Sequence, residues 1–280
     1  LFRSKILGMD LASGGHLSHG SPPNISGKIY EAHTYGVDEI TGLIDYSALM
    51  AQAKLVQPKM IIAGASAYPR SIDWSLFREI ADSVGAMLLV DMAHYSGLIA
   101  GGVFPSPIHY ADVVTSTTHK TLRGPRGGII LWNNPDYSKR INSAIFPGTQ
   151  GGPLMHIIAA KAQCFIEANT QEFKDYSQAV VQNAKAMCRV FLENGLEVQT
   201  NGTDSHIILM DLSASKHSGR QAADLLEANG ITVNKNGVPN DPRSFIETSG
   251  IRIGTAAETT RGHNEEWFKE LALKIVTILK

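Results

Sequence analysis

The spacing of apolar and polar positions from residue 59 onward alternates between the periods expected of strands and helices. Residues 59–63 and 86–90 form short apolar runs, and the second run is typical of a strand covered on both faces. Between them, Asp73 is placed to cap a helix that Gly85 closes. The apolar positions of this expected helix share one face: Leu76, Phe77, Ile80, Ala81 and Val84.

Two later apolar runs, at 111–115 and 128–132, predict strands that extend the same sheet. A strand, a helix and a second strand in this order indicate a right-handed βαβ unit. We therefore expect an α/β fold whose main sheet is mostly parallel or mixed, with helices on its flanks.

The pattern becomes helical after Pro153, which suits a first helical turn, and stays so as far as Leu192. Asn194 and Gly195 then provide a stop signal. Shorter units follow, with strands expected at 205–210 and 231–233 and helices at 220–228 and 264–279. We therefore expect a large domain over residues 1–168 and a smaller C-terminal α/β domain over 169–280, entered through the long helix.

Composition excludes several classes of protein. The chain has 280 residues, 43% of them hydrophobic, and its 25 Lys and Arg against 26 Asp and Glu give a formal net charge of −1. This balance argues against a protein that mainly grips nucleic acid or an anionic membrane, and no apolar run approaches the ~20 residues of a membrane span. Two cysteines, Cys164 and Cys188, and the lack of a secretory leader pattern predict a cytoplasmic location.

Two polar residues at expected strand ends carry the chemistry. Asp91 directly follows an apolar strand, and Lys120 ends a hydroxyl-rich run after the next strand, 29 residues later. Taken singly, Asp91 is more often a helix cap or an ion-pair partner, and Lys120 a solvated surface residue. Together they match the needs of a pyridoxal-phosphate enzyme, in which a lysine forms a Schiff base and an aspartate keeps the ring nitrogen protonated.

Eight sequence blocks, in order along the chain, make the resemblance specific: 7–11, 14–20, 35–37, 66–68, 90–94, 117–128, 146–153 and 248–255. The block Thr-Thr-His-Lys-Thr at 117–121 is the most specific. In these blocks the chain resembles serine hydroxymethyltransferase, a family of type I pyridoxal-phosphate enzymes. The resemblance implies the type I transferase fold.

The resemblance also implies a role for each matching residue. Lys120 would hold the cofactor covalently, Asp91 would pair with its ring nitrogen, and His16 would stack on its face. Further cofactor contacts are implied for Ser66, His94, Thr117 and His119, the last also affecting substrate choice. Arg252 would bind the amino-acid carboxylate. The tetrahydrofolate site would be lined by Leu11, Gly15, Leu17, Asn236, Ser244 and Phe245.

In the family, the loop matching Gly151 and Gly152 reaches the phosphate of the neighbouring subunit, so the resemblance implies a homodimer or a higher oligomer. We expect no metal, because His16 and His19 come without an accompanying cysteine or carboxylate ligand set. Ala256 stands where the family usually has proline. The family's N-terminal part, with a glutamate, tyrosines and a Ser-Gly-Ser phosphate site, and its C-terminal end are expected to lie outside this chain.

The resulting expectation is reversible conversion of serine and tetrahydrofolate to glycine and 5,10-methylenetetrahydrofolate, impaired in this chain. Catalysis would rest on Lys120, Asp91, His119 and His16. One alternative is a related aldolase that cleaves 3-hydroxy amino acids without folate. Another is a non-catalytic homologue that serves as a protein partner or an RNA-binding surface, although the near-neutral charge disfavours RNA.

Overall fold

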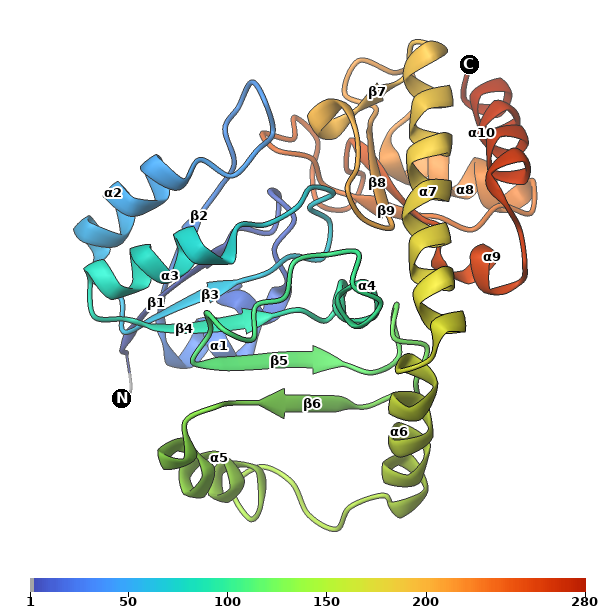
Figure 1. Ribbon diagram of the computed structural model, residues 1–280. Coiled ribbons are helices and arrows are strands. Elements are labelled where there is room, and N and C mark those ends of the chain that lie inside the picture. Colours follow the sequence, from blue (N-terminus) through green and yellow to red (C-terminus); the bar gives the residue numbers. More distant parts are fainter. Residues whose placement is uncertain (1–2) are drawn as a thin grey trace.

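The computed structural model describes residues 3–280 and contains two β-sheets flanked by helices (Figure 1). The larger sheet has the strand order β2-β1-β3-β4-β5-β6. Its strands are β1 (Lys5–Met9), β2 (Glu31–Tyr35), β3 (Met60–Ala63), β4 (Met87–Asp91), β5 (Val113–Thr117) and β6 (Gly128–Leu131). Strands β1 to β5 pair in parallel and β6 pairs antiparallel with β5, which confirms the mostly parallel mixed sheet.

The expected strand–helix–strand unit is β3, α3 (Trp74–Ser83) and β4. The Asp73 carboxylate accepts hydrogen bonds from the amides of Ser75 and Leu76, so it caps α3 as predicted. Phe77 is fully buried in the core of the sheet, where a side chain of this size stabilises the fold by about 1.5–3 kcal/mol. The other helices of this half are α1 (Ile25–Ile29), α2 (Tyr46–Val56), α4 (Ser96–Ala100) and α5 (Ser138–Ile145), with 3-10 turns η1 (Leu17–His19) and η2 (Pro135–Tyr137).

The single long helix expected after Pro153 is wrong, because the structure has two helices there. These are α6 (Met155–Ala168) and α7 (Gln171–Glu193). Thr170 breaks the run, since its backbone is extended and its hydroxyl accepts a hydrogen bond from the amide of Phe173, which caps a new helix. Pro153 lies before the first residue of α6 rather than in its first turn.

The smaller sheet is antiparallel throughout, with the strand order β7-β8-β10-β9. The strand expected at 231–233 instead forms three residues later. The amide of Ile231 donates to Leu226 O at 2.9 Å, so this segment closes the preceding helix rather than pairing in the sheet. The elements are β7 (Glu197–Val198), β8 (Ile207–Asp211), β9 (Asn234–Asn236), β10 (Gly250–Gly254), α8 (Gly219–Ala228), α9 (Ala256–Thr260), α10 (Glu265–Leu279) and the turn η3 (Gln199–Asn201).

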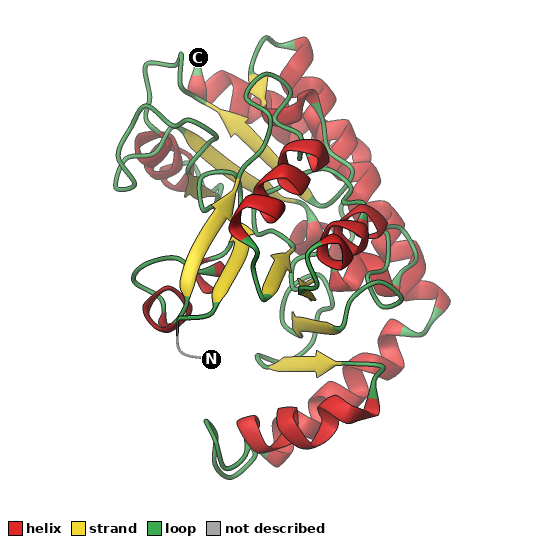
Figure 2. Cartoon of the chain, turned by 90° about the vertical axis from the view of Figure 1, so that its left-hand side faces the viewer, coloured by secondary structure: helices red, strands yellow, loops and turns green. Residues whose placement is uncertain are grey.

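Helix α7 belongs to both hydrophobic cores. Its first half packs Phe173 and Val180 into the core of the parallel sheet, and its second half packs Met187 and Phe191 into the core of the antiparallel sheet. Figure 1 shows α7 running past both sheets, and the 90° view of Figure 2 shows the N- and C-termini well apart. The domain boundary between residues 168 and 169 stays a prediction. Within residues 3–280, no helix combines the length and apolarity of a membrane span.

Candidate active site

The loops that follow four parallel strands carry the residues expected at the site. His16 follows β1, Ser66 follows β3, Asp91 ends β4 and Lys120 follows β5. Open α/β sheets bind their ligands at this edge. The first two loops are joined directly, because the amides of Ser66 and Ala67 both donate to Gly14 O, at 2.7 and 3.1 Å.

Two glycines allow the strand ends to approach each other. Gly14 has φ +104° and Gly64 has φ +117°, and both values lie in the region that favours glycine. A Cβ on Gly64 would lie 2.1 Å from Asp91 O. The end of β4 can therefore reach its observed position only because residue 64 has no side chain.

Asp91 is held in its charged form by a histidine. His19, which is buried, donates from Nε2 to Asp91 Oδ2 at 3.3 Å, and the amide of Ala93 donates to Oδ1 at 3.1 Å. Burial alone would raise the pKa of Asp91, but the hydrogen bond and charge of His19 hold it below the ordinary value of 3.8. A carboxylate that stays ionised in this way can stabilise a cationic group placed against it.

The expectation that His16 and His19 come without a carboxylate is wrong. His16 and His19 do have a carboxylate beside them, because the possible ligand atoms of His16, His19 and Asp91 all lie within 4.8 Å of one another. The carboxylate comes from a strand 72 residues away in the chain, so no local spacing reveals it. His16 Nδ1 is already engaged with Ser18, at 2.7 Å from its hydroxyl and 3.2 Å from its amide.

Lys120 is half-buried and lines a cavity of about 400 Å³, which is also lined by His94, His206 and Arg252. Burial lowers the pKa of Lys120 below the ordinary 10.5; Asp91 opposes this shift and Arg252 adds to it. A lysine with a lowered pKa has a larger neutral fraction near neutral pH, and the neutral amine is the nucleophilic form.

Two buried polar atoms at the site have no hydrogen-bond partner among residues 3–280: Thr117 Oγ1 and His206 Nδ1. Unpaired buried groups are costly, so Thr117, at the end of β5, is suited to a ligand that supplies the missing bond. His206 was not expected at the site. Its ring stacks on His94 with centroids 5.8 Å apart, and burial lowers the pKa of His206 to about 3. The pKa of His94 is also well below 6.5, through burial and then Lys120.

Arg252 reaches the site from β10 of the smaller sheet. Its guanidinium donates to Ser66 O at 2.8 Å and to Asn234 Oδ1 at 3.3 Å, which leaves other N–H groups for a ligand. His119 accepts a hydrogen bond from the amide of Gly127 at 3.4 Å, and burial followed by the charge of Arg126 lowers the pKa of His119.

A second, larger cavity of about 720 Å³ adjoins these groups, in the size range of sites for drug-sized molecules. It is bordered by His16, Ser66 and Arg252. Five of the six residues expected to contact folate line it: Leu11, Gly15, Leu17, Asn236 and Phe245. Ser244 is exposed beside Phe245 and is not part of the lining.

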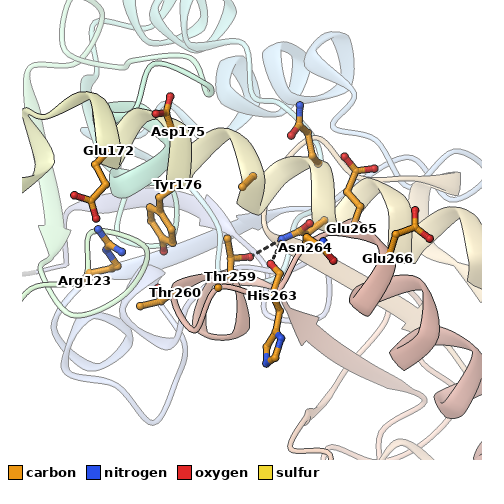
Figure 3. Close-up of a pocket in the computed structure, with 14 residues that line it drawn as sticks. Arg123, Glu172, Asp175, Tyr176, Thr259, Thr260, His263, Asn264, Glu265 and Glu266 are labelled. Carbon is orange, nitrogen blue, oxygen red and sulfur yellow. Dashed lines mark hydrogen bonds between the residues drawn. The ribbon is translucent and has the colours of Figure 1, made fainter.

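Gly151 and Gly152 lie apart from these residues. Both are exposed in the loop between α5 and α6, which runs along the edge of the molecule beyond β6 (Figure 1). A further cleft of about 720 Å³, between α7 and the turn from α9 to α10, contains none of the expected site residues (Figure 3). Of the residues expected at the site, His16, Ser66, Lys120 and Arg252 are among those that border the two adjoining cavities, whereas Ser244 and the glycine loop lie outside them.

Comparison with known proteins identifies the family of the chain. The family model described as serine hydroxymethyltransferase matches residues 2–275. The chain belongs to the serine hydroxymethyltransferase family. The serine hydroxymethyltransferase of Nitrosomonas europaea is 56% identical over 274 residues, which cover 98% of this chain and 66% of that protein.

Two further serine hydroxymethyltransferases are similarly close. The protein of Psychrobacter cryohalolentis is 57% identical over 98% of this chain and 66% of its own length. That of Rhodospirillum centenum is 55% identical over 98% of this chain and 64% of its own length. The chain thus spans slightly less than two thirds of the curated relatives it matches, and the mixed α/β architecture agrees with the type I transferase fold expected of the family.

Proposed function

We propose that this chain forms part of an enzyme that interconverts serine and glycine and transfers the one-carbon unit to tetrahydrofolate. The observation that carries the proposal is the pairing of Asp91 and Lys120 on neighbouring parallel strand ends. Between them they offer an ionised carboxylate and an amine of lowered pKa at the same edge of the sheet. The family membership and the names of the relatives support the same activity.

The donor set suits pyridoxal phosphate, which when bound supplies an electron sink for breaking bonds at the substrate Cα. Lys120 would hold the cofactor covalently, and the charged Asp91 would face its ring nitrogen. His16, exposed at the mouth of the larger cavity, would lie against the ring. The unpaired Thr117 hydroxyl, with Ser66, would complete the polar contacts.

The remaining residues would handle the substrates. Arg252 would bind the carboxylate of serine or glycine through the N–H groups that Ser66 and Asn234 leave free. His94, as a cofactor contact, and His119, which would also affect substrate choice, both have lowered pKa values. They would stay neutral near pH 7 and so could accept or donate a hydrogen bond. The larger cavity, with its apolar Leu11 and Leu17, would receive the folate.

We further propose a second copy of the chain as a partner, with Gly151 and Gly152 contributing to the neighbour's phosphate site. Large apolar side chains near this loop are strongly exposed, as expected of an interface: Phe146 62%, Leu154 62% and Met155 65%. The cytoplasmic location and the impaired activity of the chain stay predictions.

Borohydride reduction in the presence of pyridoxal phosphate, followed by peptide mapping, tests the proposal. The pyridoxyl group should be found on the peptide containing Lys120, and a label on Lys139 or Lys235 instead would contradict it. A serine-cleavage assay with and without tetrahydrofolate then separates the reactions. Cleavage of 3-hydroxy amino acids that folate does not stimulate would favour the aldolase. If no lysine carries the pyridoxyl group, the non-catalytic homologue is favoured.

A further inference from the structure

Arg123 has a backbone conformation that arginine rarely adopts. It closes the turn that begins at Lys120, with its amide donating to Lys120 O at 2.9 Å, and its φ is +60°. In this left-handed region a side chain crowds the backbone, so glycine would form the same turn with less strain. The presence of a long side chain here implies a stabilising contact that offsets the strain.

The guanidinium of Arg123 makes that contact with helix α7. Its Cζ lies 4.1 Å from the ring centroid of Tyr176 and 5.2 Å from that of Phe173. Both rings are buried, and Figure 3 shows Arg123 extending from its loop toward the face of α7 that carries Tyr176 and Glu172. We call Arg123 with these two rings the Arg123 stack. A cation placed over an aromatic face is attracted to the ring even at a partly exposed site.

Further bonds connect the Lys120 turn to its surroundings. The Tyr176 hydroxyl donates to Thr121 O at 3.4 Å. The buried Thr121 hydroxyl donates to His94 O at 2.8 Å and accepts from the amide of Gly97 at 3.0 Å. The backbone around Lys120 is therefore held between α7 on one side and the segment after β4 on the other.

We propose that Arg123 is a positioning residue for Lys120. The Arg123 stack anchors the turn on α7, so that the amine keeps its half-buried place within the electrostatic influence of Asp91 and Arg252. The purpose of this positioning rests on the proposed function of Lys120, but the position of the amine can be measured with no cofactor present. A failure of the positioning proposal can therefore be told apart from a failure of the proposed function.

The pH dependence of Lys120 acetylation reports the environment of the amine. The groups that face it are Asp91 from β4, Arg252 from β10, His16 from the loop after β1, the neighbouring His119, and the rings of His94 and His206. Burial is the main cause of its lowered pKa, so release of the turn should raise the pKa towards 10.5. Acetic anhydride labelling read by peptide mass spectrometry measures this midpoint, with the exposed Lys139 as internal reference.

Arg123→Gly and Arg123→Ala separate the contact from the strain. Both variants remove the Arg123 stack, and both should raise the midpoint of Lys120 by about half a pH unit or more. Amide hydrogen exchange over residues 118–124 should accelerate about two- to five-fold. The thermal midpoint should fall further in Arg123→Ala than in Arg123→Gly, because alanine keeps the strained φ and glycine does not.

Arg123→Lys and Arg220→Ala complete the set. Lysine keeps the charge without the planar group, so an intermediate midpoint is expected, and this conservative variant stays informative if the others fold poorly. Arg220 is an exposed arginine on α8. Its removal should change neither the acetylation midpoint of Lys120 nor the amide exchange rates of residues 118–124. Unchanged Lys120 midpoints and exchange rates in Arg123→Gly and Arg123→Lys would overturn the proposal.

Discussion

Acid should destabilise the protein through His206, a buried histidine that is neutral in the folded state. His206 is only 7% exposed, and its ring packs against His94 and edge-on against Tyr95, with 6.3 Å between the centroids of the His206 and Tyr95 rings. Nδ1 has no partner among residues 3–280 that could stabilise an added proton. Replacing His206 with leucine, which is apolar and cannot titrate, removes this effect.

The magnitude follows from the two protonation equilibria. In the unfolded chain the histidine takes up a proton as the pH falls through 6.5, whereas in the fold its pKa is about 3. The unfolded state therefore binds more protons in this window. The contribution of His206 to the free energy of unfolding is fully present above pH 6.5 and is lost as the pH falls towards 3. The slope is about 1.4 kcal/mol per pH unit, or about 2 kcal/mol lost by pH ~5.

Other groups act in identifiable windows. His94, whose pKa is also lowered, adds a loss in the same direction and the same range. The pKa of Asp91 is lowered from 3.8, so its contribution is present above about pH 4 and is lost only in stronger acid. Between about pH 4.5 and 6.5 the difference between the unchanged chain and His206→Leu therefore isolates one histidine.

Urea unfolding at a series of pH values measures this difference. The free energy of unfolding of His206→Leu should depend on pH less steeply than that of the unchanged chain, by about 1.4 kcal/mol per pH unit. His156→Leu, which replaces an exposed histidine on α6, is the matched control for losing an imidazole. Parallel curves for the unchanged chain and His206→Leu would refute the reasoning, because they would mean that the ring is solvated or paired in the fold.

Three other outcomes are expected. Asp91→Asn should lower the pKa of Lys120 and Arg252→Gln should raise it, since their charges act on the amine in these opposite directions; the acetylation midpoint measures both, and a common direction would contradict the geometry. Gly64→Ala should reduce the free energy of unfolding by about 1–3 kcal/mol, because the new Cβ meets Asp91 O and the φ is strained. Urea unfolding measures this, and a free energy of unfolding equal to that of the unchanged chain would disprove it. The chain should self-associate with rising concentration in light-scattering chromatography, and Phe146→Ser should weaken the association; a monomer at all concentrations would remove the proposed partner.

The parts of the fold that the sequence predicts are those with strong local signals. The unit β3–α3–β4 combines a capping Asp73, a one-sided apolar helix and a closing Gly85, and all three act within a few residues. The second strand lacks such signals. β2 is a partly exposed edge strand of mixed polarity, and only its pairing with β1 makes it a strand.

The site residues that the sequence predicts are likewise those with a local signal. Asp91 and Lys120 can be found because each follows an apolar run, and neighbouring parallel strands bring such ends together. The bond from His19 to Asp91 spans 72 residues of sequence, so no spacing rule predicts it. His206 precedes an apolar strand rather than following one, and its contact with His94 depends on how the two sheets pack. A polar residue at the start of a strand is too common to single out.

The placement of Arg252 also depends on the packing of the two sheets. It belongs to the antiparallel sheet, whereas Lys120 and Asp91 belong to the parallel one. The segment after β10 is fixed to α7 by a bond from the Thr255 hydroxyl to Val180 O at 2.8 Å, and both residues are fully buried. Because α7 also fills both cores, separating the guanidinium from the amine would require buried side chains to unpack. The relative position of Arg252 and Lys120 is therefore set by helix packing rather than by a flexible loop.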